Sequence, residues 1–282
     1  MKVLVTGVKG QLGFDVVNEL ESRGIEAVGV DVAEMDITDP QKVKNFIETS
    51  KVDAVIHCAA YTAVDKAEEM PDLCRKVNVD GTRNIAEVCR DLELKMIYIC
   101  TDYVFDGKGT KPFEVDSPKK PNNVYGLSKS DGEDEVIRLV KKHFIVRISW
   151  AFGINGNNFI NTMLRLGKEH GKVKVVNDQI GSPTYTFDLA RLLGDMVLSE
   201  LYGTYHATNE GYCSWYDFAV EIFKQAQMDE VVVIPVDSSE FPVKALRPLN
   251  SRLSKASLDQ NGFKRLPRWE EALKDYLNKK GV

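Results

Sequence analysis

Tyr125 and Lys129 lie four positions apart in the segment Tyr125-Gly126-Leu127-Ser128-Lys129. On a helix, side chains at this spacing share one face. A phenol with a pKa of about 10 is a weak acid at neutral pH, and a neighbouring ammonium lowers that pKa by roughly 1–3 units. The pair therefore suits general acid catalysis. In an arbitrary protein the same spacing more often marks an exposed helix surface, so its position in the fold decides between the two interpretations.

Thr101, followed by Asp102 and Tyr103, comes directly after the apolar run 96–100, which is a strand candidate. Ligands of open α/β sheets bind at the carboxyl ends of the strands. We therefore expect Thr101 to hydrogen-bond a reacting carbonyl oxygen. The alternative is that Thr101 is only a cap or turn residue.

A glycine-rich turn, Thr6-Gly7-Val8-Lys9-Gly10-Gln11-Leu12-Gly13, joins the first expected strand to the first expected helix. Gly7 permits a tight turn, Gly10 lets the backbone approach a pyrophosphate, and Gly13 allows close packing of helix and strand. The first N–H groups of the helix would face the phosphate charge. The spacing GxxGxxG occurs by chance in simple turns, but its place between strand and helix favours a dinucleotide site.

Asp31 ends the second expected strand. An acid at that position suits the ribose 2′-hydroxyl of NADH and disfavours the 2′-phosphate of NADPH. Asp36 and Ile37 follow closely and are placed to border the adenine, whereas Lys9 in the glycine turn keeps NADPH open. A strand-terminal turn is the alternative role for Asp31.

Short β-branched runs alternate with helical patterns through the first half of the 282-residue chain. Strands are expected over 3–6, 27–31, 54–59, 96–100 and 144–148, and helices over 11–23, 40–49, 71–91 and 124–141. This alternation predicts βαβ units on a buried parallel sheet. The expected fold class is α/β, a doubly wound parallel Rossmann-type sheet with a smaller mixed α/β C-terminal substrate lobe.

The regularity fades after about Trp150. Residues 1–150 are therefore expected to form the dinucleotide-binding domain, to which some later segments return, and residues 151–282 mainly a substrate-binding lobe. Helices are expected there over 158–169, 187–198, 214–227 and 269–278, strands over 173–176, 203–207 and 231–236, and a loop over 241–250.

Composition excludes several classes of protein. The chain is 43% apolar and 28% charged, which is ordinary for a globular protein and excludes wholesale disorder. With 37 basic and 42 acidic residues its net charge is −5, so no nucleic-acid partner is expected. Five cysteines without a CxxC pair predict reduced thiols, and no apolar run reaches membrane-spanning length. We expect a cytoplasmic protein without a membrane partner.

The glycine turn and the Tyr125/Lys129 pair resemble those of the extended short-chain dehydrogenase/reductases. More narrowly, the chain resembles the dTDP-4-dehydrorhamnose reductase family. The similar segments extend from residue 3 to beyond residue 250, and the later ones are the more specific. They include residues 59–68, 101–105, 123–126, 147–150, 156–159, 177–184, 247–248 and 250–251.

The resemblance implies that NADH or NADPH reduces the C4 ketone of dTDP-4-dehydro-L-rhamnose to give dTDP-L-rhamnose. Tyr125 would donate a proton to the ketone oxygen, Thr101 would orient that oxygen, and Lys129 would tune Tyr125. The implied cofactor residues are Gly7, Gly10, Gln11, Leu12, Asp31, Asp36, Ile37, Ala60, Tyr61, Thr62, Ile99, Tyr125 and Lys129. The implied substrate residues are Thr101, Asp102, Trp150, Asn177, Gln179 and Arg247.

Two other functions stay open at this point. The first is a sugar-nucleotide epimerase or dehydratase with tightly bound NAD, although dehydratases typically carry an acid where this chain has Tyr103. The second is a non-catalytic regulatory subunit of a methionine adenosyltransferase, against which the intact Thr101, Tyr125 and Lys129 argue. The resemblance also allows a homodimer and a magnesium ion, and the sequence places no metal site.

Overall fold

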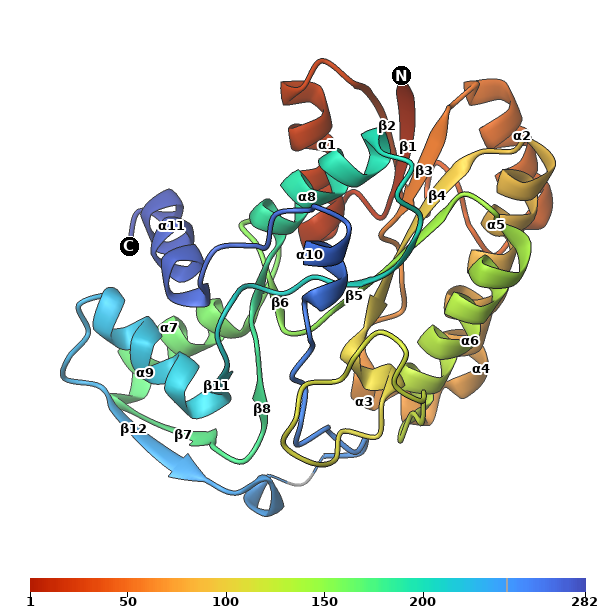
Figure 1. The fold of residues 1–282 in the computed structure, drawn as a ribbon. Coiled ribbons are helices and arrows are strands. Elements are labelled where there is room, and N and C mark those ends of the chain that lie inside the picture. Colours follow the sequence, from red (N-terminus) through yellow and green to blue (C-terminus); the bar gives the residue numbers. More distant parts are fainter. Residues whose placement is uncertain (242) are drawn as a thin grey trace.

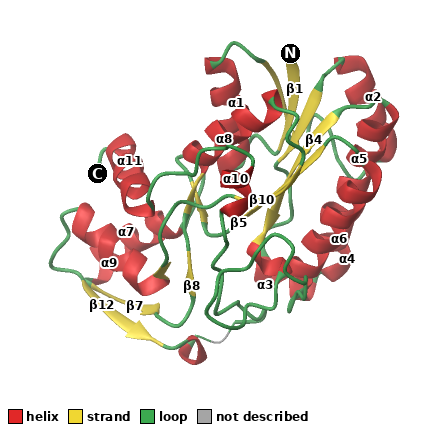
Figure 2. Ribbon diagram, viewed as in Figure 1, coloured by secondary structure: helices red, strands yellow, loops and turns green. Residues whose placement is uncertain are grey.

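The computed structural model describes residues 1–241 and 243–282; Pro242, within the loop expected over 241–250, lies outside the described residues. Figures 1 and 2 show a larger lobe built around a sheet and a smaller lobe beside it that contains the C-terminal helix. No helix of residues 1–241 and 243–282 is both long enough and apolar enough to cross a membrane.

A six-stranded parallel sheet forms the centre of the larger lobe, in the order β2-β1-β3-β4-β5-β10. Its strands are β1 (Lys2–Thr6), β2 (Glu26–Val30), β3 (Ala54–His57), β4 (Lys95–Thr101), β5 (His143–Ile148) and β10 (Gly203–His206). The central strands are buried because helices cover both faces of the sheet. The predicted doubly wound α/β fold is confirmed.

Helices α1 (Gln11–Ser22) and α8 (Thr186–Leu198) cover one face of this sheet. Helices α2 (Pro40–Ser50), α5 (Thr82–Asp91) and α6 (Val124–Leu139) cover the other. The apolar stripe Leu12, Val16 and Leu20 of α1 is buried against the sheet, as its spacing predicts. Although α8 and β10 come late in the chain, both lie in the larger lobe.

The smaller lobe is centred on β7 (Lys172–Val176) and β12 (Val232–Val236), which pair in parallel. Helices α7 (Phe159–His170), α9 (Trp215–Gln225) and α11 (Trp269–Lys280) share an apolar cluster with this pair. The shorter elements near this lobe are β6 (Ala151–Phe152), β8 (Ile180–Gly181), β9 (Thr184–Tyr185), β11 (Cys213–Ser214) and η3 (Ser238–Glu240). Helix α10 (Ala256–Gln260) instead packs against β10 of the larger lobe.

The prediction of a single helix over 71–91 is wrong in detail. This segment consists of α4 (Pro71–Arg75), a π-helical turn η1 (Lys76–Gly81) and α5, and a separate helix α3 (Val64–Glu69) precedes it. Within η1, Asn78 accepts a hydrogen bond from Tyr61 N at 2.8 Å and donates to Tyr61 O at 3.1 Å. The wider turn thereby fastens the loop after β3 to the helix, which sequence periodicity does not reveal.

Candidate active site

A cavity of about 630 Å³ opens at the carboxyl ends of β1, β3, β4 and β5. Its wall includes the glycine turn, the residues that follow β3, the end of β4 and the residues that follow β5. Thirteen of the expected site residues line it: Gly7, Gly10, Gln11, Leu12, Asp31, Ala60, Thr62, Ile99, Thr101, Asp102, Tyr125, Lys129 and Trp150. The structure therefore brings the expected dinucleotide turn and the expected catalytic side chains to one place.

A second cavity, of about 280 Å³, adjoins the first. Asp36, Ile37 and Tyr61 line it, and Gly7, Asp31, Ala59 and Ala60 line both cavities. Asp31 thus lies at the junction, directly after β2. A dinucleotide can extend from the catalytic side chains, past the glycine turn, into a separate pocket for its adenosine end.

The glycine turn has the geometry that a close-lying pyrophosphate needs. Gly7 has φ +71°, and a Cβ on Gly13 would lie 2.3 Å from the carbonyl oxygen of Gly7. Helix α1 begins at Gln11, and no side chain caps its start. Its first backbone N–H groups therefore lie at the cavity without a side-chain partner and can bind a phosphate. The side chain of Gln11 instead accepts a hydrogen bond from Gly153 N at 2.8 Å, which fastens the turn to the loop after β6.

Helix α6 positions Tyr125 and Lys129, and Asn123 caps its start by accepting a hydrogen bond from Gly126 N at 2.7 Å. Lys129 is 3% exposed, and its Nζ lies 4.0 Å from the centre of the Tyr98 ring. Burial lowers the pKa of Lys129 to about 8. Lys129 is nevertheless mostly charged at neutral pH.

The expected lowering of the Tyr125 pKa by Lys129 is not found. Burial raises the pKa of the Tyr125 phenol, and a hydrogen bond with Thr101 opposes that shift without cancelling it. Removing water from around the phenol therefore outweighs the nearby ammonium. Tyr125 holds its proton firmly in this structure.

Thr101 is the last residue of β4, Asp102 follows it directly, and their side chains share a hydrogen bond. Thr101 Oγ1 donates to Asp102 Oδ1 at 3.1 Å and accepts from Tyr103 N at 3.3 Å. The other oxygen of Asp102 accepts a hydrogen bond from Ser251. Burial raises the pKa of Asp102 to about 6, against the opposing hydrogen bonds from Ser251 and Thr101. Sequence reasoning did not place Ser251 at the site, although residues 250–251 belong to the similar segments.

Trp150 lines the cavity two residues after the end of β5 and has a left-handed backbone with φ 51°. Its ring stacks on Trp215 of α9 with ring centres 3.8 Å apart. A Cβ on Gly181 would lie 2.9 Å from the Trp150 ring. The ring thus packs against the smaller lobe at the edge of the cavity, in an unusual backbone conformation that tight packing maintains.

Three expected substrate residues do not line either cavity. Asn177 accepts a hydrogen bond from Ser214 at 2.8 Å, and Gln179 donates to Ser238 at 2.9 Å. Arg247 pairs with Asp65 of α3 at 2.5 Å. Their contacts with a nucleotide diphosphate or its base stay predictions.

Metal ligands do not cluster in the part of the chain that the structure describes, since no group of three or more His, Cys, Asp or Glu side chains there could hold an ion. The buried His57 on β3 lies 2.8 Å from Thr6 Oγ1 and 3.2 Å from Thr82 Oγ1. Burial lowers its pKa to about 3. His57 is therefore a neutral residue of the sheet core.

Comparison with known proteins matches residues 1–281 to the family described as RmlD substrate binding domain. The spore coat polysaccharide biosynthesis protein SpsK of Bacillus subtilis is 38% identical, over 99% of this chain and 98% of its own. A dTDP-4-dehydrorhamnose reductase of Aggregatibacter actinomycetemcomitans is also 38% identical, over 97% of each chain. The crystal structure of a dTDP-4-dehydrorhamnose reductase from Bacillus anthracis, in complex with NADP, is 42% identical with a TM-score of 0.96 over 99% of each chain.

Proposed function

The chain belongs to the RmlD substrate binding domain family, and on that premise we propose that it is an NAD(P)H-dependent dTDP-4-dehydrorhamnose reductase. It reduces the C4 ketone of dTDP-4-dehydro-L-rhamnose and yields dTDP-L-rhamnose. The observation that carries this proposal is the single cavity lined by the glycine turn and by Thr101, Tyr125 and Lys129. Relatedness along the whole chain, rather than the fold alone, supports the choice of substrate.

The residues present fit a nicotinamide dinucleotide, since the uncapped start of α1 opens on the cavity that Gly7, Gly10 and Gln11 line, and Gly13 lets the helix pack closely on the turn. When bound, the dinucleotide supplies the hydride. Gly10, Gln11 and Leu12 bind its pyrophosphate through the backbone. Asp31, Asp36, Ile37 and Tyr61 surround its adenosine end.

The side chains of the cavity handle the proton and the position of the ketone. Tyr125 donates its phenolic proton to the C4 oxygen, and Thr101 hydrogen-bonds the same oxygen. The ammonium of Lys129 binds ribose hydroxyls and stabilises the phenolate that Tyr125 becomes. Trp150 and Asp102 border the sugar.

The test follows the absorbance of NADPH, and separately NADH, during incubation with enzymatically made dTDP-4-dehydro-L-rhamnose. We expect one equivalent of cofactor to be oxidised per dTDP-L-rhamnose formed. Tyr125→Phe should still bind the cofactor and lose about 10²–10⁴-fold in kcat, the usual worth of a general acid. Tyr202→Phe is the matched control because the buried Tyr202 hydroxyl has no hydrogen-bond partner among the described residues. Retained turnover in Tyr125→Phe contradicts the assignment.

The same assay separates the other functions. Bound NAD that is recycled without net oxidation would indicate an epimerase or dehydratase. Cofactor binding without any turnover, together with co-purification of a second enzyme, would indicate a regulatory subunit. The intact Thr101, Tyr125 and Lys129 argue against a regulatory subunit. Tyr103, which stands where dehydratases typically carry an acid, argues against a dehydratase.

We propose that residues 1–150 with the returning segments bind the dinucleotide and that the remainder binds the substrate. The preference between NADH and NADPH, a homodimer, a magnesium ion and a cytoplasmic location stay predictions. The name of the Bacillus subtilis relative supports a place for the product in polysaccharide biosynthesis.

A further inference from the structure

Ser251 approaches the cavity from the C-terminal part of the chain and is 1% exposed. Its hydroxyl donates to Oδ2 of Asp102, while Oδ1 of the same carboxyl lies 3.1 Å from Thr101 Oγ1. Ser251 does not line the cavity, whereas Asp102 and Thr101 do. It therefore acts on Thr101 only through Asp102.

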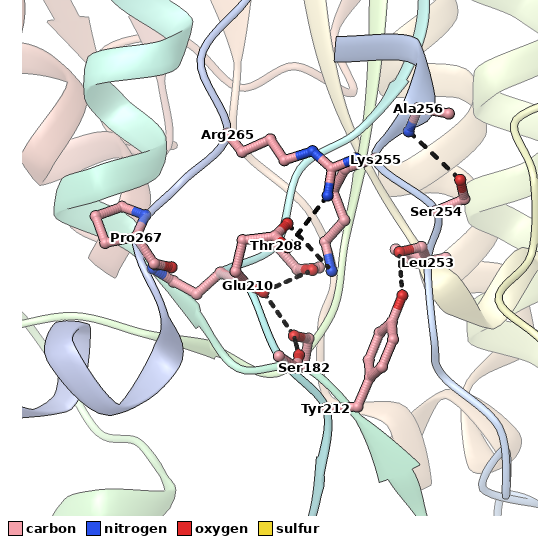
Figure 3. A network of polar contacts seen from close by, with 12 residues as sticks. Ser182, Thr208, Glu210, Tyr212, Leu253, Ser254, Lys255, Ala256, Arg265 and Pro267 are labelled. Atoms are coloured by element: carbon pink, nitrogen blue, oxygen red, sulfur yellow. Dashed lines mark hydrogen bonds and ion pairs between the residues drawn. The ribbon is translucent and has the colours of Figure 1, made fainter. Parts of the chain in front are cut away.

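The backbone around Ser251 is held from several directions. Ser251 N donates to Ile180 O at 2.8 Å, and Ser254 N donates to Phe113 O at 2.9 Å. Figure 3 shows the network at the far end of this segment, where the Tyr212 hydroxyl donates to Leu253 O at 3.1 Å. In the same view Lys255, which is 3% exposed, pairs with Glu210 at 3.9 Å. These contacts fix the segment, so the Ser251 hydroxyl keeps its place against Asp102.

We propose that Ser251 is a positioning residue that sets the direction in which the Thr101 hydroxyl donates its proton. The inference rests on the proposed function, in which Thr101 hydrogen-bonds the ketone oxygen. Because Ser251 donates to Oδ2, a proton carried by Asp102 lies on Oδ1, the oxygen that faces Thr101.

A hydroxyl has one proton and two lone pairs. With Asp102 ionised, Thr101 Oγ1 donates to Oδ1 across 3.1 Å. When Asp102 is neutral, the proton on Oδ1 reverses this hydrogen bond, and together with the backbone N–H of Tyr103 it fills both lone pairs of Thr101. The Thr101 proton then points into the cavity, toward the Tyr125 phenol or toward a bound ketone oxygen. When Asp102 is ionised, Oδ1 takes the Thr101 proton instead. The hydroxyl can then only accept from the cavity, and a ketone oxygen, itself an acceptor, gains no hydrogen bond.

The ionisation of Asp102 therefore controls the state of Thr101. Burial raises the pKa of Asp102 to about 6, and hydrogen bonds from Ser251, Thr101 and the backbone oppose that shift. The titratable groups that face its charge are the phenols of Tyr103 and Tyr125, and burial raises the pKa of both, so they stay neutral. Lys129 lines the same cavity. We expect kcat/KM to fall as the pH rises through the Asp102 pKa.

A first test needs no turnover. The infrared carbonyl band of protonated Asp102, assigned by its loss in Asp102→Asn, is followed against pH in the full-length protein. Ser251→Ala removes a hydrogen bond to the charged form and should raise the titration midpoint by about one pH unit. Ser251→Thr keeps a hydroxyl and should keep the parental midpoint. Ser257→Ala, which loses a buried hydroxyl without a hydrogen-bond partner among the described residues, is the matched control. An unmoved midpoint in Ser251→Ala overturns the proposal.

A second test measures the pH profile of kcat/KM with NADPH and the keto sugar. In Ser251→Ala the descending limb should move to higher pH by about one unit, and the low-pH plateau should fall because the Asp102 proton is then shared between two oxygens. The affinity for NADPH should not change. A loss that is equal at every pH, without a shift, would show a merely structural role and overturn the proposal. If the parent itself does not oxidise NADPH, the proposed function fails, and the infrared midpoint still decides the role of Ser251.

Discussion

Replacing Glu133 with Gln should weaken the attachment of the catalytic helix to the sheet. Glu133 lies on α6, four residues after Lys129 and eight after Tyr125, on the same face. Its carboxylate accepts two hydrogen bonds from Arg147 of β5, at 2.6 and 2.9 Å, and the two side chains are 1% and 4% exposed. Lys119 lies 3.3 Å from the same carboxylate. The substitution leaves the buried Arg147 without its counter-charge.

Removing one partner of a buried ion pair costs about 3–5 kcal/mol. Gln keeps the shape and one acceptor oxygen, so we expect the free energy of unfolding to fall by about 3 kcal/mol, the lower end of that range. Urea unfolding of the cofactor-free protein at pH 7 measures the change. Glu169→Gln is the control. The side chains of Glu169 and its partner Arg165 are 47% and 59% exposed, so their ion pair should contribute less than about 0.5 kcal/mol to the free energy of unfolding. A change below about 1 kcal/mol in Glu133→Gln would refute the assigned role of the pair.

The pH dependence separates charge from packing. Burial by itself raises the pKa of Glu133, but the hydrogen bonds and charge of Arg147 outweigh burial and hold it below its ordinary value. The stability that this shift contributes is complete above the unfolded pKa of about 4.3 and is lost as the pH falls through the lower folded value. The difference between parent and Glu133→Gln should therefore shrink below about pH 4. A difference that is constant with pH would assign the effect to packing.

Two further substitutions test the cofactor site. Gly13→Ala places a Cβ 2.3 Å from Gly7 O, so the turn must shift and the affinity for NADPH should fall at least about tenfold. Fluorescence titration measures this affinity. An unchanged affinity would contradict the need for close packing of α1 on the glycine turn. Lys129→Met removes a buried ammonium whose pKa burial lowers to about 8, so NADPH should bind more weakly while the cofactor-free protein gains thermal stability at pH 7. The parent's unfolding free energy should rise between pH 8 and about 10.4, where the unfolded state binds the extra proton, and Lys129→Met should lack that rise.

Residues whose roles depend on local chain geometry were predictable from the sequence. The turn from β1 to α1 is one example, because Gly7, Gly10 and Gly13 must follow a strand and begin a helix to have any joint role. The position of Thr101 at the end of β4 and the Tyr125/Lys129 pair on α6 are others. In each case one strand end or one helix face fixes the side chain, and the parallel sheet gathers the strand ends at one edge.

Contacts between distant segments were not predictable in this way. Ser251 meets Asp102 across 149 positions of sequence. The two-residue strands β8 and β11 pair with each other, and Ile180 of β8 also bridges Asn250, far along the chain. The π-helical turn η1 exists because Asn78 reaches Tyr61 and Ser128, and neither partner is visible in the apolar periodicity of 71–91. Such features depend on tertiary contacts that override local pattern.

The raised pKa of Tyr125 differs from the lowered pKa that the sequence suggests, and it is still compatible with reduction of a ketone. Hydride transfer to a ketone leaves an alkoxide, whose basicity is comparable to that of hydroxide, the conjugate base of water with a pKa of about 15.7. Even a buried phenol can therefore give up its proton to that oxygen, and the raised pKa ensures that Tyr125 carries the proton beforehand. Lys129, still charged at neutral pH, then stabilises the phenolate. Oxidation of the product would require Tyr125 to start as phenolate, so burial, which raises the pKa of this phenol, should slow the reverse reaction at neutral pH.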